Sequence, residues 1–282
     1  MPDLTRRAFL ASASVPASAM FALPRRQTAE PATAFALLGD RYHNSDHYRT
    51  AFGKTFVRDM GLSIDFSDDV TRLNDAHLGR YRLLIILRDG MVWPDGHGDP
   101  SSNAGWWAQG QPAIVSEPPL PVIEPRSVGF MTPAMGRAVR RFVERGGAAL
   151  LYHNVTYIAP YNDDFRDVLG AVTRGHPPTR TFTVRVVNRD HPITRGVSDF
   201  VVTDEQHYVE YQKDPEHLLL ESVNEDGLTH GDWGTRSAAG WAHPYGEGRV
   251  CYLAPGHLIT ALWNPEYETI QRNAARWLLR QT

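Results

Sequence analysis

The stretch GWAHPYGEGRVCYLAPGHLITALWNPEYETIQRNAARWLLR, residues 240–280, decides the fold of this chain. Two apolar segments, Ser237–Pro244 and Arg249–Ala254, predict strands. The glycines of Tyr245-Gly246-Glu247-Gly248 between them favour a tight reversal, so a hairpin is expected. His257 follows the second strand directly, and the carboxyl ends of strands are where open α/β sheets gather ligand-binding groups.

The last part of the same stretch predicts a helix. Asn264 is a good helix cap and Pro265 suits the first helical position. One face of this helix is apolar at the spacing of an amphipathic helix that packs on a sheet; it comprises Tyr267, Ile270, Ala274, Trp277 and Leu278.

Strands and helices alternate upstream of this stretch. Apolar runs predict strands at Ala34–Leu38, Leu62–Phe66, Tyr81–Leu87 and Ala148–Tyr152. Helices are expected up to about Met60, from Thr132-Pro133 to Gly146-Gly147, and over Asp163–Val172. Later strands are expected at Thr181–Val187, Phe200–Thr203 and Leu218–Val223. The alternation indicates an α/β fold with a mainly parallel sheet, extended by antiparallel strands.

Composition limits the function classes. The chain has 282 residues, 42% of them hydrophobic, and a net charge of −3, which argues against a dedicated nucleic-acid binder. No later apolar run is long enough to span a membrane. Cys251 is the only cysteine, so an intramolecular disulfide and multi-cysteine zinc sites are excluded. Its mid-strand position indicates a core residue rather than a nucleophile.

The N-terminus resembles an export signal. Thr5-Arg6-Arg7-Ala8-Phe9-Leu10 precedes the small and apolar run Ala11–Leu23, the order of a twin-arginine signal. Cleavage is expected after Ala19 or nearer Thr33. We therefore expect residues 1–31 to be a signal peptide and linker, residues 32–282 to be the mature domain, and the protein to be periplasmic or secreted.

Residues 90–131 interrupt the pattern with many Pro, Gly and Trp residues. So long an insert in a compact domain is usually functional, and we expect it to form a lid or a pocket wall. Trp106 within it could stack on a sugar ring. The alternative is that its indole only packs the loop in place.

Imidazoles and carboxylates follow the predicted strands. They are Asp40, His43, His153 with Asn154, Asp204 with Glu205, His207, and His257. The set could supply general acids and bases, or His and carboxylate ligands to a divalent metal ion. Plainer interpretations also exist: Asp204-Glu205 could be solvated, His43 and His47 could share one helix face, and His191 before Pro192 could be a structural hydrogen-bonding group.

Several motifs together carry a family resemblance. In order they are HPITRGVSDF at 191–200, Thr203-Asp204-Glu205, YGEGRV at 245–250, Gly256-His257 and Arg276-Trp277-Leu278. Over about Ala34–Leu279 the chain resembles the trehalose-utilisation (ThuA-like) family. The resemblance implies the class I glutamine amidotransferase-like fold, a flavodoxin-like three-layer sandwich. It also implies a role in the catabolism of disaccharides or their 3-keto derivatives.

Two segments depart from the family pattern. The loop after the first strand is Gly39-Asp40-Arg41-Tyr42-His43, and Gln206-His207-Tyr208 after the acidic pair adds an imidazole. True amidotransferases place a nucleophilic Cys on a strand-to-helix elbow, and here His153 follows the fourth strand. We therefore expect no glutamine amidotransferase activity.

The sequence leaves three hypotheses. The first is an exported enzyme, a hydrolase, lyase or isomerase, that acts on a disaccharide or 3-keto-glycoside by acid/base or metal-assisted chemistry. The second is a non-catalytic sugar-binding or accessory protein, and the third is a partner of a periplasmic sugar dehydrogenase. A homo-oligomer is compatible with each.

Roles are assigned under the first hypothesis. The predicted catalytic residues are His153, Glu205, His257 and Asp40. The predicted substrate contacts are His43, Asn154, Asp204, His207 and Trp106. If a zinc-like divalent ion is bound, its expected ligands are His43, His153 and His257.

Overall fold

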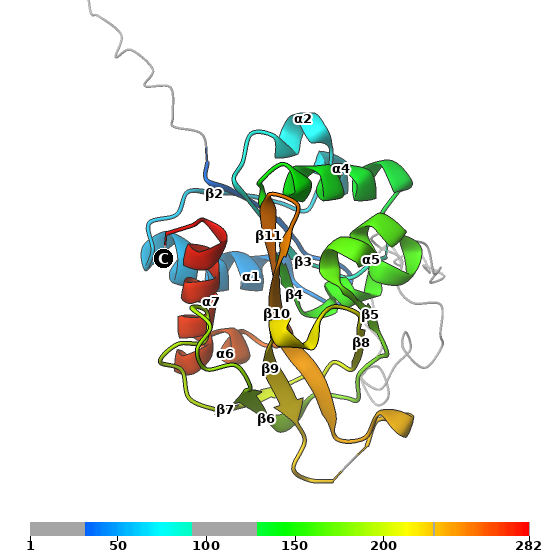
Figure 1. Cartoon of the computed structure of the whole chain (residues 1–282), viewed down its shortest axis with the longest axis vertical. Helices are drawn as coiled ribbons and strands as arrows, with labels where there is room; N and C mark the ends of the chain where they lie inside the picture. Colours follow the sequence, from blue (N-terminus) through cyan, green and yellow to red (C-terminus); the bar gives the residue numbers. More distant parts are fainter. Residues whose placement is uncertain (1–31, 92–128, 228, 282) are drawn as a thin grey trace, which may run out of the picture. The chain divides into compact units, whose positions relative to one another are not determined.

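The predicted hairpin lies at the centre of a nine-stranded sheet (Figure 1). The computed structural model describes residues 32–91, 129–227 and 229–281. The strand order is β2-β1-β3-β4-β11-β10-β9-β6-β7. Its strands are β1 (Ala34–Leu38), β2 (Ile64–Ser67), β3 (Leu83–Leu87), β4 (Ala148–Tyr152), β6 (Arg180–Val186), β7 (Phe200–Asp204), β9 (Leu218–Val223), β10 (Arg236–Tyr245) and β11 (Gly248–Leu253). Two short strands, β5 (Ala171–Thr173) and β8 (Val209–Tyr211), pair separately.

Strands β2, β1, β3, β4 and β11 are mutually parallel. Their order corresponds to the flavodoxin-like arrangement, in which strand order reverses beside the first strand. β1, β3 and β4 are buried along their whole length, as expected for parallel strands covered on both faces. Their carboxyl ends therefore meet at one edge of the sheet.

The other half of the sheet is antiparallel. β10, β9, β6 and β7 continue from β11 with alternating direction, so β7 again runs parallel to β11. The register between β10 and β9 shifts around Gly240, and such irregularities bend a strand. The end of β7 lies beside the end of β11, where Asp204 accepts the backbone N–H groups of Gly256 and His257, each at 3.0 Å.

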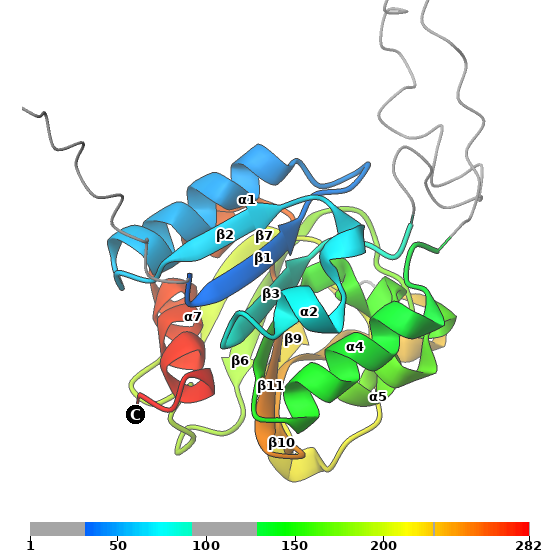
Figure 2. The ribbon, with the colours of Figure 1, turned by 90° about the horizontal axis from the view of Figure 1, so that it is seen from above.

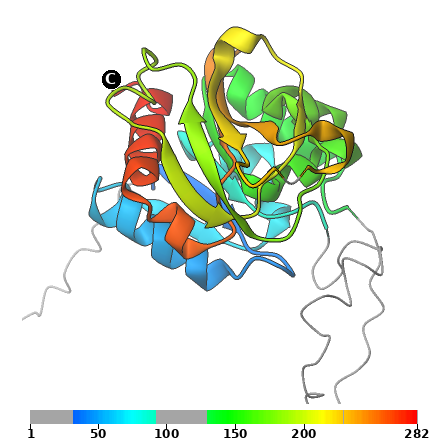
Figure 3. The same cartoon turned by 90° about the horizontal axis from the view of Figure 1, so that it is seen from below.

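Helices cover both faces of the sheet (Figures 2 and 3). One layer holds α1 (Ser45–Phe52), a π-helical continuation (Gly53–Arg58), α6 (Ile259–Leu262) and α7 (Pro265–Leu278). The other layer holds α2 (Asp75–Leu78), α4 (Pro133–Glu144) and α5 (Asp163–Leu169). Short 3-10 turns lie at Val70–Arg72, His153–Tyr157, Ala159–Tyr161, Pro215–His217 and Gly231–Trp233. The predicted α/β, flavodoxin-like three-layer sandwich is confirmed.

The helix starts follow the predicted signals. Asn264 caps α7 by accepting the N–H groups of Glu266 and Tyr267 at 3.1 and 3.3 Å, and Thr132 caps α4. The core-facing side of α7 is the predicted one, although Trp277 is only partly buried and lies under the guanidinium group of Arg249.

The helical segment expected up to about Met60 is present, as α1 followed by the π-helix that ends at Arg58. Two local predictions were wrong. The helix expected over Asp163–Val172 ends at Leu169, because Gly170 adopts a left-handed conformation (φ +79°) and the following residues pair with β8. His43 and His47 do not share a helix face, since His43 precedes α1 in a loop and His47 is exposed.

Of the predicted insert, only the ends are described. Met91 and Gly129 form a β-bridge, and Phe130 donates its N–H to Gly90. Trp106 and the predicted signal peptide lie outside the described residues. Among the described helices, none combines the length and apolar character that crossing a bilayer requires.

Candidate functional site

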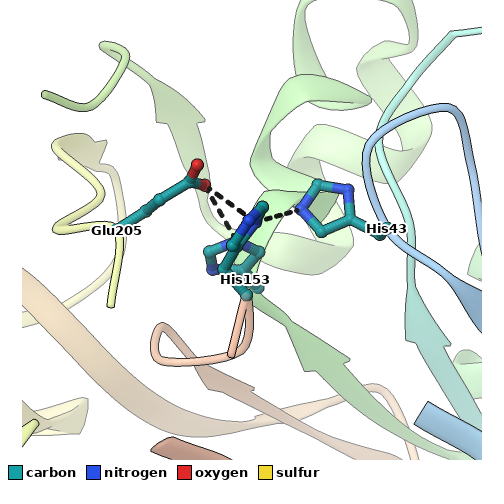
Figure 4. A group of neighbouring side chains, drawn as sticks. His43, His153 and Glu205 are labelled. Carbon is teal, nitrogen blue, oxygen red and sulfur yellow. Dashed lines mark hydrogen bonds and ion pairs between the residues drawn. The ribbon is translucent and has the colours of Figure 1, made fainter. Parts of the chain in front are cut away.

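Four strand ends deliver polar side chains to one edge of the sheet. β1 is followed by Asp40 and His43, β4 by His153 and Asn154, and β11 by His257, while β7 ends at Asp204 and is followed by Glu205. These residues converge, and Figure 4 shows His43, His153 and Glu205 pointing toward one another.

Asp40 fixes the orientation of His43. Its carboxylate lies 2.8 Å from Nδ1 of His43 and also accepts the N–H groups of Tyr42 and Asp89. Asn154 Nδ2 donates to the same carboxylate at 3.1 Å. With Nδ1 engaged by Asp40, the other ring nitrogen of His43 faces the site, 3.2 Å from Nδ1 of His257. A carboxylate behind a histidine is a common support for a metal-ligating imidazole.

His153 occupies a strained elbow after β4. Its φ angle is +52°, in the left-handed region that side chains other than glycine rarely adopt. A Cβ on Gly256 would lie 2.7 Å from Cβ of His153, so only glycine fits there. Nδ1 of His153 lies 2.9 Å from the carbonyl oxygen of Ala254 and must donate to it, which leaves Nε2 as an acceptor aimed into the site.

Asp204 holds the His257 loop and is fully buried. Its carboxylate accepts three backbone N–H groups, those of Glu205, Gly256 and His257. The substrate contact predicted for Asp204 remains untested, and this geometry favours a supporting role. Asp40 and Asn154 are likewise buried behind the histidines.

One oxygen of Glu205 is the point of convergence. Oε2 lies 3.3 Å from Nε2 of His153, 3.4 Å from Nδ1 of His257 and 3.5 Å from Nε2 of His207. His176 also approaches it, with Nε2 at 3.6 Å. Sequence reasoning missed His176 because it follows no parallel strand.

The pairing of β5 with β8 brings His176 into the site. Arg174 donates its N–H to Tyr208, and Tyr208 donates its N–H to Gly175. This ladder lays His176 beside His207, and the two rings stack with centroids 4.7 Å apart. Nothing in the local sequence indicates this pairing of β5 with β8.

The donor set fits a divalent cation. His43, His153, Glu205 and His257 each present one ligand atom, and these atoms lie within 4.8 Å of one another. Ligands about 2.0–2.1 Å from a tetrahedral zinc ion lie about 3.3–3.4 Å apart, and three of the six separations in this set, at 3.2, 3.3 and 3.4 Å, are close to that spacing. Nε2 of His153 is buried without a hydrogen-bond partner among the described residues, although it faces a carboxylate. Two acceptors in this position require a cation or a proton between them.

The pKa values of the buried carboxyl groups are shifted by their surroundings. Burial by itself raises the pKa of Asp40 and of Glu205, but the neighbouring imidazoles outweigh it and hold both pKa values below their usual range. Burial raises the pKa of Asp204 to about 6, against the opposing effect of His153.

The histidines differ in protonation. Burial lowers the pKa of His257 to about 4 despite the proximity of Glu205, so this imidazole is neutral near pH 7, the form that binds metals. For His43, burial lowers the pKa, but the charge of Asp40 outweighs it and the net shift is upward.

Two other sequence features lie away from the site. Cys251 is buried within β11, and burial raises the pKa of its thiol, as expected for a core residue. A cavity of about 350 Å³ lies at the opposite edge of the sheet, between Arg82, Gly147 and Arg280, and no imidazole lines it. The convergence of donors, not this cavity, marks the candidate site.

Comparisons with known proteins agree with this architecture. A ThuA-like protein from Bacteroides uniformis superposes with a TM-score of 0.57 and 18% identity, over 91% of this chain and 95% of that one. A ThuA-like protein from Parabacteroides merdae gives a TM-score of 0.61 and 12% identity, over 89% and 91% of the two chains. At these identities the likeness shows the fold. None of the curated proteins compared matches the chain.

The family itself is identified by sequence. The model of the family ThuA, described as trehalose utilisation, matches residues 125–278 of the 282-residue chain, which is more than half of it. The matched segment contains His153, Glu205 and His257. The chain therefore belongs to the ThuA, or trehalose-utilisation, family.

Proposed function

We propose that this protein is a metal-dependent enzyme of carbohydrate catabolism that acts on a disaccharide or a 3-keto-glycoside. The family description supports the carbohydrate role. The observation that carries the chemistry is the convergence of three imidazoles, those of His43, His153 and His257, with Glu205 around one point. A divalent cation held there would polarise a carbonyl group or activate water.

The chain's own residues would each have a defined part. Asp40 keeps the proton of His43 on Nδ1, so that Nε2 faces the site. Ala254 does the same for His153 through its carbonyl oxygen. Asp204 holds His257 by its backbone.

The open side of the site determines how a sugar would approach. The side chains of His257 and His176 are 25% and 28% exposed, whereas those of His153 and His207 are fully buried. A substrate would therefore arrive past His257 and His176, with Glu205, 12% exposed, as the carboxylate within reach of its hydroxyl groups.

The test combines metal analysis with turnover. The mature protein, purified without chelator, should hold a stoichiometric transition metal and convert 3-keto-glycosides. His153→Ala should lose turnover and the ion held by the His43, His153 and His257 imidazoles, whereas His47→Ala, which changes an exposed imidazole outside the cluster, should keep both. Wild-type protein that converts 3-keto-glycosides equally well with and without metal would refute the metal-dependent mechanism. Metal binding with no turnover on any sugar tested would favour the non-catalytic sugar-binding protein instead.

We also propose export through the twin-arginine pathway, on the order of residues Thr5–Leu23. Replacing Arg6 and Arg7 with Lys should retain the precursor in the cytoplasm, as measured by cell fractionation. Equal export of the double variant and the wild type would refute this route.

A further inference from the structure

A second donor set lies on the other side of Glu205. Oε2 of Glu205 is approached by Nε2 of His207 at 3.5 Å and by Nε2 of His176 at 3.6 Å. The ligand atoms of these three residues also lie within 4.8 Å of one another. The proposed metal centre uses neither imidazole.

His207 is buried, and neither of its ring nitrogens has a hydrogen-bond partner within the described part of the chain. Its side chain is fully buried, and neither Nδ1 nor Nε2 has a hydrogen-bond partner among the described residues. Burying a polar atom without a hydrogen-bond partner is energetically unfavourable, and a cation bound at Nε2 would offset that cost for one of the two nitrogens. Nε2 is the nitrogen aimed at the Glu205 carboxylate.

His176 is fixed in the tautomer that suits a ligand. Its Nδ1 lies 2.9 Å from the carbonyl oxygen of Pro177, which can only accept, so Nδ1 carries the proton. Nε2 therefore presents a lone pair to Glu205 Oε2. This repeats the arrangement of His153, whose Nδ1 donates to the carbonyl of Ala254. Oε2 of Glu205 thus has Nε2 of His153 on one side and Nε2 of His176 on the other. All three atoms are hydrogen-bond acceptors.

We propose that His176, His207 and Glu205 hold a second divalent transition-metal ion, so that Glu205 bridges a two-metal centre. This inference rests on the proposed metal function of His43, His153 and His257. Imidazole and carboxylate ligands suit zinc and its first-row neighbours. Three protein ligands leave coordination positions open, as in catalytic rather than structural sites, and His176 lies on the exposed side of the pair.

The experiment counts ions and measures their proximity, without an activity assay. Metal-free full-length mature protein is titrated with Mn²⁺, and bound metal per chain is measured together with the electron paramagnetic resonance spectrum. Wild-type protein should bind two ions whose spins couple, because one oxygen joins them. His176→Ala should bind one ion with an uncoupled signal, and His207→Gln should do the same.

Two controls make the result specific. His230→Ala removes an imidazole that contacts the carbonyl of Arg174 in the same loop region but does not belong to either donor set, and it should keep both ions. Circular dichroism establishes that His207→Gln, a buried change, is folded. His176 is partly exposed, so its variant tests the proposal even if His207→Gln does not fold.

The outcomes separate this inference from the proposed function. One ion per chain in wild type and in His176→Ala alike would overturn the second site and leave the first. Two ions in His176→Ala would also overturn it, because the second ion would lie elsewhere. No bound ion in the wild type would remove both the second site and the proposed metal centre.

Discussion

The carboxylate of Asp204, at the end of β7, accepts the backbone N–H of His257 after β11 at 3.0 Å, although three strands separate β7 from β11 in the sheet. This contact joins the far end of the antiparallel half of the sheet to the parallel half. It also places Glu205, the next residue, against His257. One buried aspartate therefore joins the two halves of the candidate site.

Asp204→Asn should destabilise the protein by about 1–3 kcal/mol. An amide can present only one acceptor oxygen, whereas the carboxylate serves three N–H donors through both of its oxygens. Urea unfolding would measure the change, with the exposed Asp190→Asn as the matched control. Equal unfolding midpoints for Asp204→Asn and wild type would contradict this account.

Asp40→Asn should weaken metal binding about 10- to 100-fold, the usual effect of losing a carboxylate behind a ligating histidine. The neutral amide lacks the negative charge with which Asp40 keeps the proton of His43 on Nδ1. Competition with a chromophoric chelator would measure the affinity, and Asp46→Asn, an exposed change nearby, should leave it unchanged. An Asp40→Asn affinity within twofold of wild type would show that His43 is not held for a metal.

Gly256→Ala should cost about 1–3 kcal/mol, because its Cβ would lie 2.7 Å from that of His153. The cost should shrink in a His153→Gly background, where the opposing Cβ is absent and glycine suits the left-handed backbone. A double-mutant cycle from urea unfolding measures this coupling. Gly53→Ala, whose Cβ would meet nothing within 4 Å, is the control. If Gly256→Ala lowered the free energy of unfolding equally in the wild-type and His153→Gly backgrounds, the contact between the two Cβ atoms would be ruled out.

Metal removal should lower thermal stability. An ion bound only by the folded state at 100 times its dissociation constant contributes about 2.7 kcal/mol, or roughly 5–10 °C in Tm for a domain of this size. Scanning calorimetry with and without added Zn²⁺ should show this difference in the wild type and a smaller one in His153→Ala. A shift of equal size in His153→Ala would mean that the ion binds elsewhere.

Acid should destabilise the fold through His243, a residue of β10 far from the donor cluster. Burial lowers its folded-state pKa to about 4, with further lowering by Lys213 and His217, against about 6.5 in the unfolded chain. At pH values between about 4 and 6.5, His243 is protonated in the unfolded chain and neutral in the folded one. Its contribution to stability is therefore complete above about pH 6.5 and is lost as the pH falls toward about 4.

The size of this acid effect is as much as about 2–3 kcal/mol. His243→Gln keeps a donor for the carbonyl of Val168, which lies 3.1 Å from Nε2, but cannot titrate in this range. Urea unfolding at pH 7 and pH 4.5 should therefore show a smaller difference for His243→Gln than for wild type. An unchanged difference would assign the acid sensitivity to other groups.

The sequence was sufficient for the parallel half of the fold. Short uniform apolar runs bounded by turn residues, such as Leu83–Leu87, favour strands buried on both faces, and the caps Thr132 and Asn264 mark helix starts by local chemistry. The rule that parallel strand ends share an edge then places Asp40, His153 and His257 together. These inferences need only short-range pattern and chain direction.

The rest of the site depends on long-range geometry. Nothing local to Glu205 shows that the end of β7 meets the loop after β11, since this contact depends on how the whole antiparallel half of the sheet is arranged. His176 enters through the β5–β8 pairing, in a segment where a helix was expected to continue through Val172. The left-handed backbone of His153 (φ +52°) could not be predicted either, because only a small minority of histidines adopt it and the close approach of Gly256 to its Cβ is a long-range contact.

The wide separation of the donors along the chain has a consequence for the order of assembly. Residues 43, 153, 205 and 257 meet only after the parallel strands have paired and β7 has closed against the His257 loop. Contacts so distant in sequence form late in folding, so an ion cannot act as a template for early structure. The compartment in which the chain completes folding would then select the ion. If the proposed twin-arginine export holds, the chain crosses the membrane already folded, and that compartment would be the cytoplasm, whatever metals are abundant outside it.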